Sequence, residues 1–225
     1  MHIVYRMCGI ASSNPSPIYQ EDKFRLNELC LKSFINAFSD VKPEVTFLLD
    51  KCDEAYLNLL KIVPFKYTVE EANLGINGTM LLAYDIASEL EDYVVFQECD
   101  YLYHRVIGKT YLAAMKELGI VSPYDHPNFY HLRKYHREEC RIKIVDNHHF
   151  RTAERNTMTW GCHSSIVKQH RQLLDRHGYL DGPVWDELQT EGLNLWVPIP
   201  AFATHMVRDC LSPGIDWKDT WQSIQ

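Results

Sequence analysis

The segment Tyr93-Val94-Val95-Phe96-Gln97-Glu98-Cys99-Asp100 combines a buried strand with an acidic end. Its apolar, β-rich start is typical of a strand inside a helix-covered sheet. Glu98 and Asp100 stand two positions apart, so an extended chain directs both carboxylates to one side. Carboxylates held together without a cation repel each other, whereas a hard divalent cation prefers oxygen ligands. The acidic end therefore predicts either a Mg²⁺ or Mn²⁺ site or an acidic turn that caps the next helix.

Short β-rich runs alternate with longer amphipathic runs upstream of this segment. We expect strands at residues 3–5, 45–49, 65–69 and 93–96, and helices at 21–38, 54–62 and 79–90. This alternation is typical of a mostly parallel central sheet flanked by helices, because parallel strands need long crossover connections. The sequence therefore predicts an α/β fold with a Rossmann-like N-terminal half.

The second half of the chain is less regular. We expect helices at 107–118 and 165–176, strands at 157–160 and 193–199, and a long His-rich excursion at 124–149. Pro198 and Pro200 restrict the last strand to a sheet edge or an irregular end, because proline has no N–H to donate to a ladder. No repeat or linker separates two units, so we expect a single domain over residues 1–225.

Composition excludes several classes of protein. The 225 residues include 23 Lys and Arg against 30 Asp and Glu, which gives a formal net charge of −7 and argues against nucleic acid as a partner. No apolar run reaches the roughly 18 residues that span a bilayer, and no secretory signal is visible. The seven separated cysteines argue against a disulfide framework. We therefore expect a protein of the cytosol or of a cytosolic membrane surface.

Further polar residues follow the predicted strands, at the edge where open α/β sheets bind ligands. These residues are Arg6, Gly9, Asp50 and Asp53. His205, beyond the last predicted strand, is a third candidate metal ligand that favours Mn²⁺ over Mg²⁺, with a structural histidine as the alternative. The loop at 73–78 is expected either to bring backbone N–H groups to a phosphate or to cap the following helix.

Motifs of other enzyme classes do not occur. The sequence has no G-x-x-x-x-G-K-[ST] phosphate loop, no G-x-G-x-x-G after its first strand and no G-x-S-x-G elbow. Two further groups of side chains suit sugar or phosphate contacts as well as structural roles. They are Arg151, Arg155, Thr157 and Thr159, which also suit a solvated face, and Trp160, Trp185 and Trp196, which also suit core packing.

Several dispersed motifs together resemble glycosyltransferases of the A-type (GT-A) fold. They are YRMCG at 5–9, FLLD at 47–50, the E-x-D end of the fourth strand, FRTAERNTMTW at 150–160 and IPAFATHMVRDCLSPGIDW at 199–217. More narrowly, they are similar to a small glycosyltransferase-like group of viral and bacterial genomes. The resemblance covers nearly the whole chain and implies a nucleotide-sugar-binding half at 1–105 and an acceptor and catalytic half at 106–225.

The resemblance also implies roles for individual residues. Asp100 would be a direct metal ligand, Glu98 a ribose, water or metal contact, and His205 the C-terminal metal ligand. Glu98 departs from the family pattern, which has Asp at that position. The implied donor contacts are Arg6, Gly9, Asp50, Asn77 and Gly78, with Arg151 as a phosphate or acceptor contact.

An inverting member of this family needs a carboxylate to deprotonate the acceptor hydroxyl. The resemblance places this base in LDGPVWDEL at 180–188, where Asp181 is preferred over Asp186, and a turn or helix cap is the structural alternative.

The implied function is a metal-dependent glycosyltransferase. It would use Mn²⁺ or Mg²⁺ and a UDP-sugar or GDP-sugar donor, and it would transfer a hexose or pentose to a glycan, lipid-linked or small-molecule acceptor. One alternative is a catalytically silent module of the same fold that binds a nucleotide or a glycan. Another is a His-rich metal hydrolase built on residues 126–149. A sugar nucleotidyltransferase shares the architecture, but the sequence lacks an early Gly-rich loop containing Arg.

Overall fold

A computed structural model describes residues 1–10, 14–133, 135 and 139–224 of the chain. The N-terminal half contains β1 (His2–Cys8), α1 (Lys23–Ala37), β2 (Glu44–Asp50), α2 (Glu54–Leu59), the 3₁₀ turn η1 (Leu60–Ile62), β3 (Tyr67–Glu71), α3 (Gly75–Glu89) and β4 (Tyr93–Glu98). Within the described part of the chain, no helix is both long enough and apolar enough to cross a membrane.

The C-terminal half begins with a short strand directly after the acidic segment. Its elements are β5 (Tyr101–Tyr103), α4 (Gly108–Leu118), β6 (Ile120–Val121), α5 (Asn128–His131), β7 (Ile142–Val145), β8 (His148–Ala153), β9 (Trp160–His163), α6 (Ser164–Gln169), α7 (Arg171–His177), α8 (Asp181–Thr190), β10 (Leu195–Ile199), β11 (Ala203–His205), η3 (Arg208–Cys210) and α9 (Trp217–Ile224).

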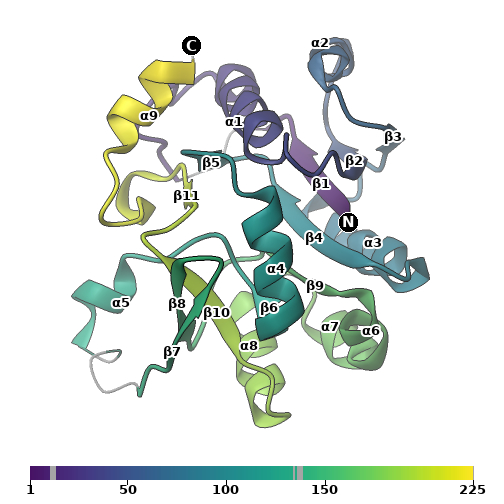
Figure 1. Ribbon diagram of the computed structural model, residues 1–225. Helices are drawn as coiled ribbons and strands as arrows, with labels where there is room; N and C mark the ends of the chain where they lie inside the picture. Colours follow the sequence, from purple (N-terminus) through teal and green to yellow (C-terminus); the bar gives the residue numbers. More distant parts are fainter. Residues whose placement is uncertain (11–13, 134, 136–138, 225) are drawn as a thin grey trace.

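A nine-stranded sheet runs through the molecule in the order β3-β2-β1-β4-β9-β6-β10-β8-β7 (Figure 1). The first four of these strands are parallel to one another, which confirms the predicted Rossmann-like half. Strand β9 is antiparallel to β4 and joins this half to the C-terminal strands. The predicted α/β class, with helices flanking a central sheet, is confirmed.

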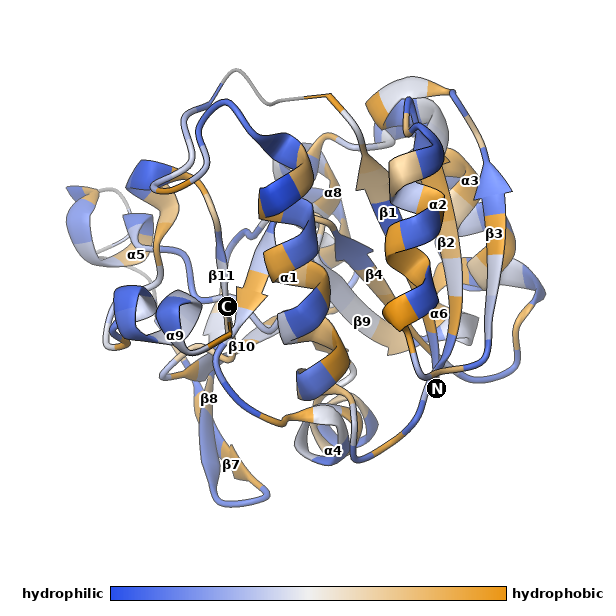
Figure 2. Ribbon diagram, turned by 90° about the horizontal axis from the view of Figure 1, so that it is seen from above, coloured by the Kyte–Doolittle hydropathy of each residue, from blue (hydrophilic) through white to orange (hydrophobic). Residues whose placement is uncertain are grey.

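Helices cover both faces of the sheet (Figure 2). Successive strand residues point to opposite faces, so Tyr5 belongs to one buried cluster and Val4 to another. The first cluster includes side chains of α1, α2 and α4, and the second includes side chains of α3, α6, α7 and α8. Burial on both faces explains why β2 and β4 are almost continuously apolar in sequence.

A small second sheet lies over the end of β4. In it β11 pairs antiparallel with β5, and the register places His205 opposite Tyr101. A third buried cluster, which includes Leu102, Met206 and Trp217, packs this sheet against α1 and α9. The pairing therefore brings a histidine 105 positions downstream next to the acidic end of β4.

The last strand was expected at a sheet edge or with an irregular end, and strand β10 corrects the first of these alternatives. It lies inside the sheet, paired with β8 over its whole length and with β6 at Leu195 and Trp196. The Trp196 carbonyl faces β6, where it accepts a hydrogen bond from the Ser122 N–H. Backbone groups two residues apart on a strand face the same side, so the nitrogen of Pro198 also faces the side of β6. It lies beyond the end of β6, and proline therefore removes no hydrogen bond of the ladder there.

The excursion at 124–149 contains more structure than expected. It holds α5 and the first strand of the β7–β8 hairpin, and the two hairpin strands are joined by Asp146 and Asn147. Both turn residues have positive φ angles, of 47° and 61°, which two-residue hairpin turns require. His136, in the middle of the excursion, lies outside the described residues.

Helix boundaries also differ from those expected. Helix α3 begins at Gly75, inside the predicted 73–78 loop. Its start follows from the positive φ of Gly75 and from the Asp50 carboxylate, which accepts a hydrogen bond from the Gly75 N–H at 3.0 Å. The predicted helix at 165–176 is two helices, α6 and α7, that meet at His170.

Gly9 provides a test of the contact between β1 and β2. A Cβ atom at this position would lie 2.2 Å from the Lys51 carbonyl oxygen, closer than side-chain atoms approach backbone. We expect Gly9→Ala to lower the free energy of unfolding by about 1–3 kcal/mol, measured by urea titration. The control is Gly182→Ala, where the nearest atom belongs to the flexible Arg155 side chain at 3.5 Å. Equal midpoints for both variants would contradict this account.

Candidate functional site

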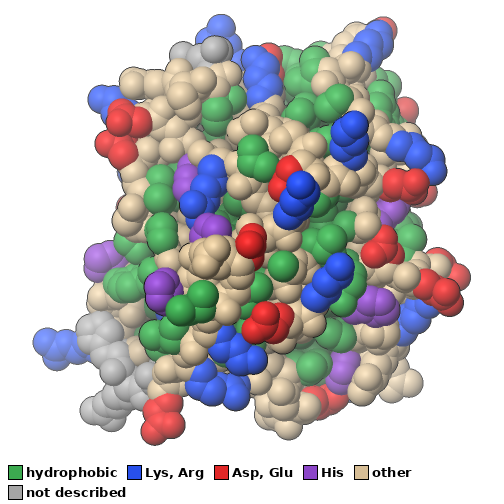
Figure 3. Space-filling model, in the orientation of Figure 1, with side chains coloured by type: hydrophobic (Ala, Val, Ile, Leu, Met, Phe, Trp, Pro, Cys, Tyr) green, Lys and Arg blue, Asp and Glu red, His purple; other side chains and the backbone are tan. Residues whose placement is uncertain are grey.

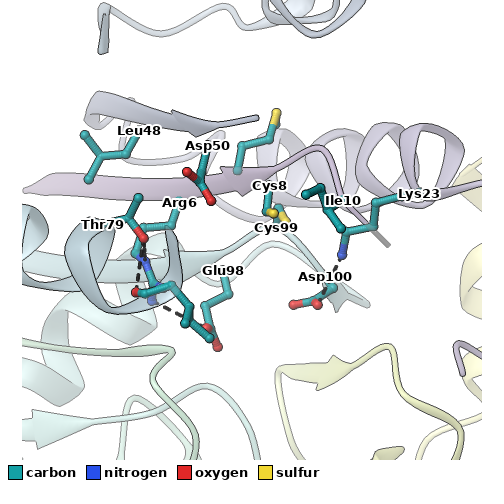
Figure 4. Close-up of a pocket in the computed structure, with 12 residues that line it drawn as sticks. Arg6, Cys8, Ile10, Lys23, Leu48, Asp50, Thr79, Glu98, Cys99 and Asp100 are labelled. Carbon is teal, nitrogen blue, oxygen red and sulfur yellow. Dashed lines mark hydrogen bonds and ion pairs between the residues drawn. The ribbon is translucent and has the colours of Figure 1, made fainter. Parts of the chain in front are cut away.

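A cavity of about 230 Å³ lies where the carboxyl ends of β1, β2 and β4 meet (Figure 4). Open parallel sheets bind ligands at this edge. Three carboxylates and two cations line the cavity: Asp50, Glu98, Asp100, Arg6 and Lys23. The sequence predicted four of these five, and Lys23, from the start of α1, was missed. We call this cavity the donor pocket, after the role that the sequence resemblance predicts for it.

The Arg6 side chain connects β1 to the first turns of α3. Its guanidinium donates to the Ile76 carbonyl oxygen at 3.0 Å and to the Thr79 hydroxyl at 3.4 Å, and it lies 3.5 Å from a Glu98 carboxylate oxygen. Only 8% of the residue is exposed. Burial raises the pKa of the Glu98 carboxyl, and the positive charge of Arg6 opposes that effect. Arg6 is therefore fixed in place at the wall of the pocket.

Asp100 is flanked by two cationic side chains. Its Oδ2 atom lies 3.3 Å from Lys23 Nζ and 3.6 Å from His205 Nε2. Desolvation favours the neutral carboxyl, but Lys23 and His205 outweigh it and hold the pKa of Asp100 well below its usual range. Burial by itself would lower the pKa of His205, but the Asp100 carboxylate raises it to about 10. At neutral pH this cluster is one carboxylate between two cations.

The predicted metal ligands meet at one place but do not form a ligand group. Among the described residues, no three His, Cys, Asp or Glu side chains lie close enough together to hold a metal ion. Asp100 faces Lys23 and His205, while Glu98 faces Arg6. The donor set as arranged does not fit a divalent cation, and we derive no chemical step through one. The Mn²⁺ or Mg²⁺ requirement stays a prediction.

A second cavity, of about 160 Å³, lies in the C-terminal half. Its lining residues are His126, Asn128, Phe129, Tyr135, Arg155, Asn156, Thr157 and Asp181. We call it the acceptor pocket, after the role that the sequence resemblance predicts for this half of the chain. Tyr101 connects it to the acidic cluster: its ring stacks on His205 with the centroids 5.0 Å apart, and its hydroxyl hydrogen-bonds to Thr157. Asp100, His205, Tyr101 and Thr157 therefore form a chain of contacts from one pocket to the other.

The structure separates the two candidate bases. Asp181, the first residue of α8, lines the acceptor pocket and accepts a hydrogen bond from the Gly182 N–H at 2.7 Å. Partial desolvation raises the pKa of its carboxyl, against that N–H and the charges of His126 and Arg155. Asp186 is held outside the pocket in a two-point ion pair with Arg155, at 3.0 and 2.8 Å. Asp181 alone of the two faces a cavity.

Four other predicted ligand contacts, of the donor or the acceptor, are not among the lining residues of the donor pocket. Gly9 and Gly78 give the backbone room for close approach, to Lys51 and to Leu74 respectively. Asn77 accepts a hydrogen bond from the Tyr179 N–H, which joins α3 to the segment before α8. Arg151 is buried in an ion pair with Asp125 at 2.6 Å. None of these four side chains lines the donor pocket as described.

Other residues that the sequence suggested as sugar or phosphate contacts have structural roles. The three candidate tryptophans are at most 4% exposed and pack in the core. Thr159 is buried and accepts a hydrogen bond from the Glu98 N–H, so it supports the end of β4. Cys210 lies beside His126 and His205, and these imidazoles lower the pKa of its thiol to about 6. A spacing pattern in the sequence does not reveal this cluster, because β11 and η3 create it.

Charged side chains of both signs are interspersed on the face shown in Figure 3, with histidines among them. This mixture agrees with the modest net charge of −7. The expected absence of a nucleic-acid partner stays a prediction.

Comparisons with known proteins support the fold. No protein-family model matches the chain, and no curated protein matches its sequence. Among solved structures, the inositol-1-phosphate CTP transferase of T. maritima superposes with a TM-score of 0.54 at 12% identity, over 99% of this chain and 95% of that one. A nucleotidyl transferase of Methanothermobacter thermautotrophicus reaches 0.50 at 10% identity, over 87% and 85% of the two chains.

A third solved structure, a 4-diphosphocytidyl-2C-methyl-D-erythritol synthase of Anaerococcus prevotii, also reaches a TM-score of 0.50, at 9% identity and over 86% of each chain. The fold of the chain is thus the GT-A-like fold of nucleotide-diphospho-sugar transferases, as the sequence motifs predicted. At these identities the likeness is one of fold alone.

Proposed function

We propose that the chain is a nucleotide-sugar-dependent glycosyltransferase. The observation that carries the proposal is a pair of polar pockets linked by the contacts of His205 and Tyr101 with Asp100 and Thr157. One pocket places Arg6 and Lys23 among carboxylates at the carboxyl ends of parallel strands, and the other places Asp181 at its lining. In this proposal residues 1–105 bind a UDP-sugar or GDP-sugar and residues 106–225 bind the hydroxyl acceptor.

The proposed reaction moves one sugar between two oxygens. The acceptor oxygen bonds to the anomeric carbon, the bond from that carbon to the diphosphate oxygen breaks, and the nucleoside diphosphate leaves. In an inverting reaction Asp181 takes the acceptor's hydroxyl proton on a carboxylate oxygen. Arg6 and Lys23 face the negative charge that develops on the leaving diphosphate, where fixed positive charge lowers the barrier.

Calorimetric binding of UDP, GDP, CMP and dTDP in Mn²⁺ buffer tests the donor pocket. We expect one nucleotide to bind and Asp100→Ala to weaken it about 10- to 100-fold, because a hydrogen-bonded charge that organises the pocket is lost. Glu71→Ala is the matched control, since Glu71 ends the neighbouring strand β3 without lining the pocket. If none of the four nucleotides binds, the proposed function fails.

A sugar nucleotidyltransferase is the second candidate, favoured by the likeness in fold to the nucleotidyl transferase, the diphosphocytidyl-methylerythritol synthase and the CTP transferase described above. Such an enzyme joins a nucleoside triphosphate to a phosphate compound and releases pyrophosphate. Incubation with CTP, UTP or dTTP and a sugar phosphate distinguishes the two reactions. Pyrophosphate release would favour this candidate. Hydrolysis or transfer from a nucleotide sugar favours the glycosyltransferase, and nucleotide binding without turnover indicates a silent binding module.

A further inference from the structure

We infer that Lys23 is the resident cation of the donor pocket, so that a nucleoside diphosphate binds there without a divalent metal ion. This inference rests on the proposed function and concerns the same pocket. It replaces the metal ion expected from sequence with a side chain of the protein. In the pocket, Lys23 lies beside Asp100 (Figure 4).

The main chain fixes where the Lys23 ammonium group lies. Lys23 is the first residue of α1, whose start is capped by the Asp22 carboxylate accepting from the Arg25 N–H. Farther along α1, Leu26 and Leu29 are buried against the small sheet and α9. The Lys23 side chain is only 9% exposed. A lysine this buried requires a charge partner, which Asp100 supplies at 3.3 Å.

A divalent cation at Asp100 would have to displace Lys23. The same carboxylate oxygen, Oδ2, lies near both Lys23 Nζ and His205 Nε2. The other carboxylate of the pair, Glu98, faces Arg6. A metal ion there would meet the Lys23 ammonium group and the Arg6 guanidinium, and repulsion between like charges in a partly buried site opposes its binding.

Lys23 also has the donors that a diphosphate needs. An ammonium group carries three N–H donors, and among the described residues its side chain hydrogen-bonds only to Asp100. The guanidinium of Arg6 is more fully engaged, with Ile76, Thr79 and Glu98 around it. Lys23 is therefore the cation in this pocket with free capacity for phosphate oxygens, and Arg6 adds charge behind it.

The test measures binding of UDP and GDP by calorimetry, first in EDTA and then in Mn²⁺. For the wild-type protein we expect dissociation constants in the two buffers to agree within about threefold. Lys23→Ala is expected to weaken nucleotide binding in EDTA at least about tenfold, because the variant loses one hydrogen bond between charged groups. Lys23→Arg should keep most of the affinity, and Lys32→Ala, which removes an exposed lysine of the same helix, should keep all of it.

Two results of the nucleotide titrations would overturn the inference. One is wild-type binding that appears only with Mn²⁺, and the other is unchanged affinity of folded Lys23→Ala in EDTA. Calorimetric titration of the wild-type protein with Mn²⁺ alone gives a readout that needs neither variant nor nucleotide, and tight Mn²⁺ binding would also overturn it. Failure of the proposed function is distinguishable, because then no nucleotide binds in either buffer.

Discussion

Asp181→Asn is expected to lower kcat for sugar transfer by about 10²- to 10⁴-fold, the contribution of a positioned general base. Asparagine keeps the shape of the side chain and an oxygen for the Gly182 N–H, but it cannot take a proton. Nucleotide affinity should change less than about twofold, because Asp181 lines the acceptor pocket and not the donor pocket. Transfer is measured by release of nucleoside diphosphate.

The matched control is Asp186→Asn, five positions later on the same helix. Asp186 is exposed and paired with Arg155 outside the pocket, so this variant should keep kcat within about threefold. Wild-type turnover by Asp181→Asn would remove Asp181 from the base role. Equal losses in both variants would point instead to a general effect on α8.

The acid side of the pH profile gives a second readout for the same residue. A base acts when it is deprotonated, so kcat falls as the pH drops through the pKa of Asp181 in the folded protein. Desolvation in the pocket raises that pKa above the ordinary value for Asp, and the fall should begin at a correspondingly higher pH. The Asp181→Asn variant should lose this limb of the profile. A limb that persists unchanged would assign it to another group.

Local patterns in the sequence determine most of the N-terminal half. The runs at 45–49 and 93–96 are apolar because both faces of β2 and β4 are covered, and this is visible without a structure. The β7–β8 hairpin was missed, although Asp146 and Asn147 are typical residues of a two-residue turn. Strand β7 is only four residues long and carries the exposed Ile142 and Ile144, so it lacks a clear alternation of buried apolar and exposed polar residues.

The candidate site was predictable in part for the same reason. Glu98, Asp100 and Asp50 end predicted strands, and parallel strands bring their ends to one edge. Lys23 and Tyr101 reach the site through tertiary packing of α1 and β5, which no spacing rule reports. Arg151 is the opposite case. A sequence motif suggested that it contacts a ligand, but the fold buries it as the ion-pair partner of Asp125.

That ion pair predicts the largest effect on stability. Arg151 and Asp125 are 6% and 2% exposed, and the guanidinium also lies 4.4 Å from the centre of the Phe129 ring. Arg151→Leu leaves the Asp125 carboxylate buried without its cation, which we expect to lower the free energy of unfolding by about 3–5 kcal/mol. The matched control is Arg155→Leu, which breaks an exposed pair and should cost less than about 1 kcal/mol.

The sign of the pH dependence distinguishes a buried charge from lost packing. Burial already raises the pKa of Asp125 in the folded protein, and Arg151 opposes that shift. Without Arg151 the pKa rises further, so the folded state binds a proton that the unfolded state releases above about pH 4. The loss of stability in Arg151→Leu should therefore grow as pH rises from 4 towards 8, measured by urea titration at each pH. A loss that is constant over this range would show that packing on Phe129, and not the charge of Asp125, accounts for the effect.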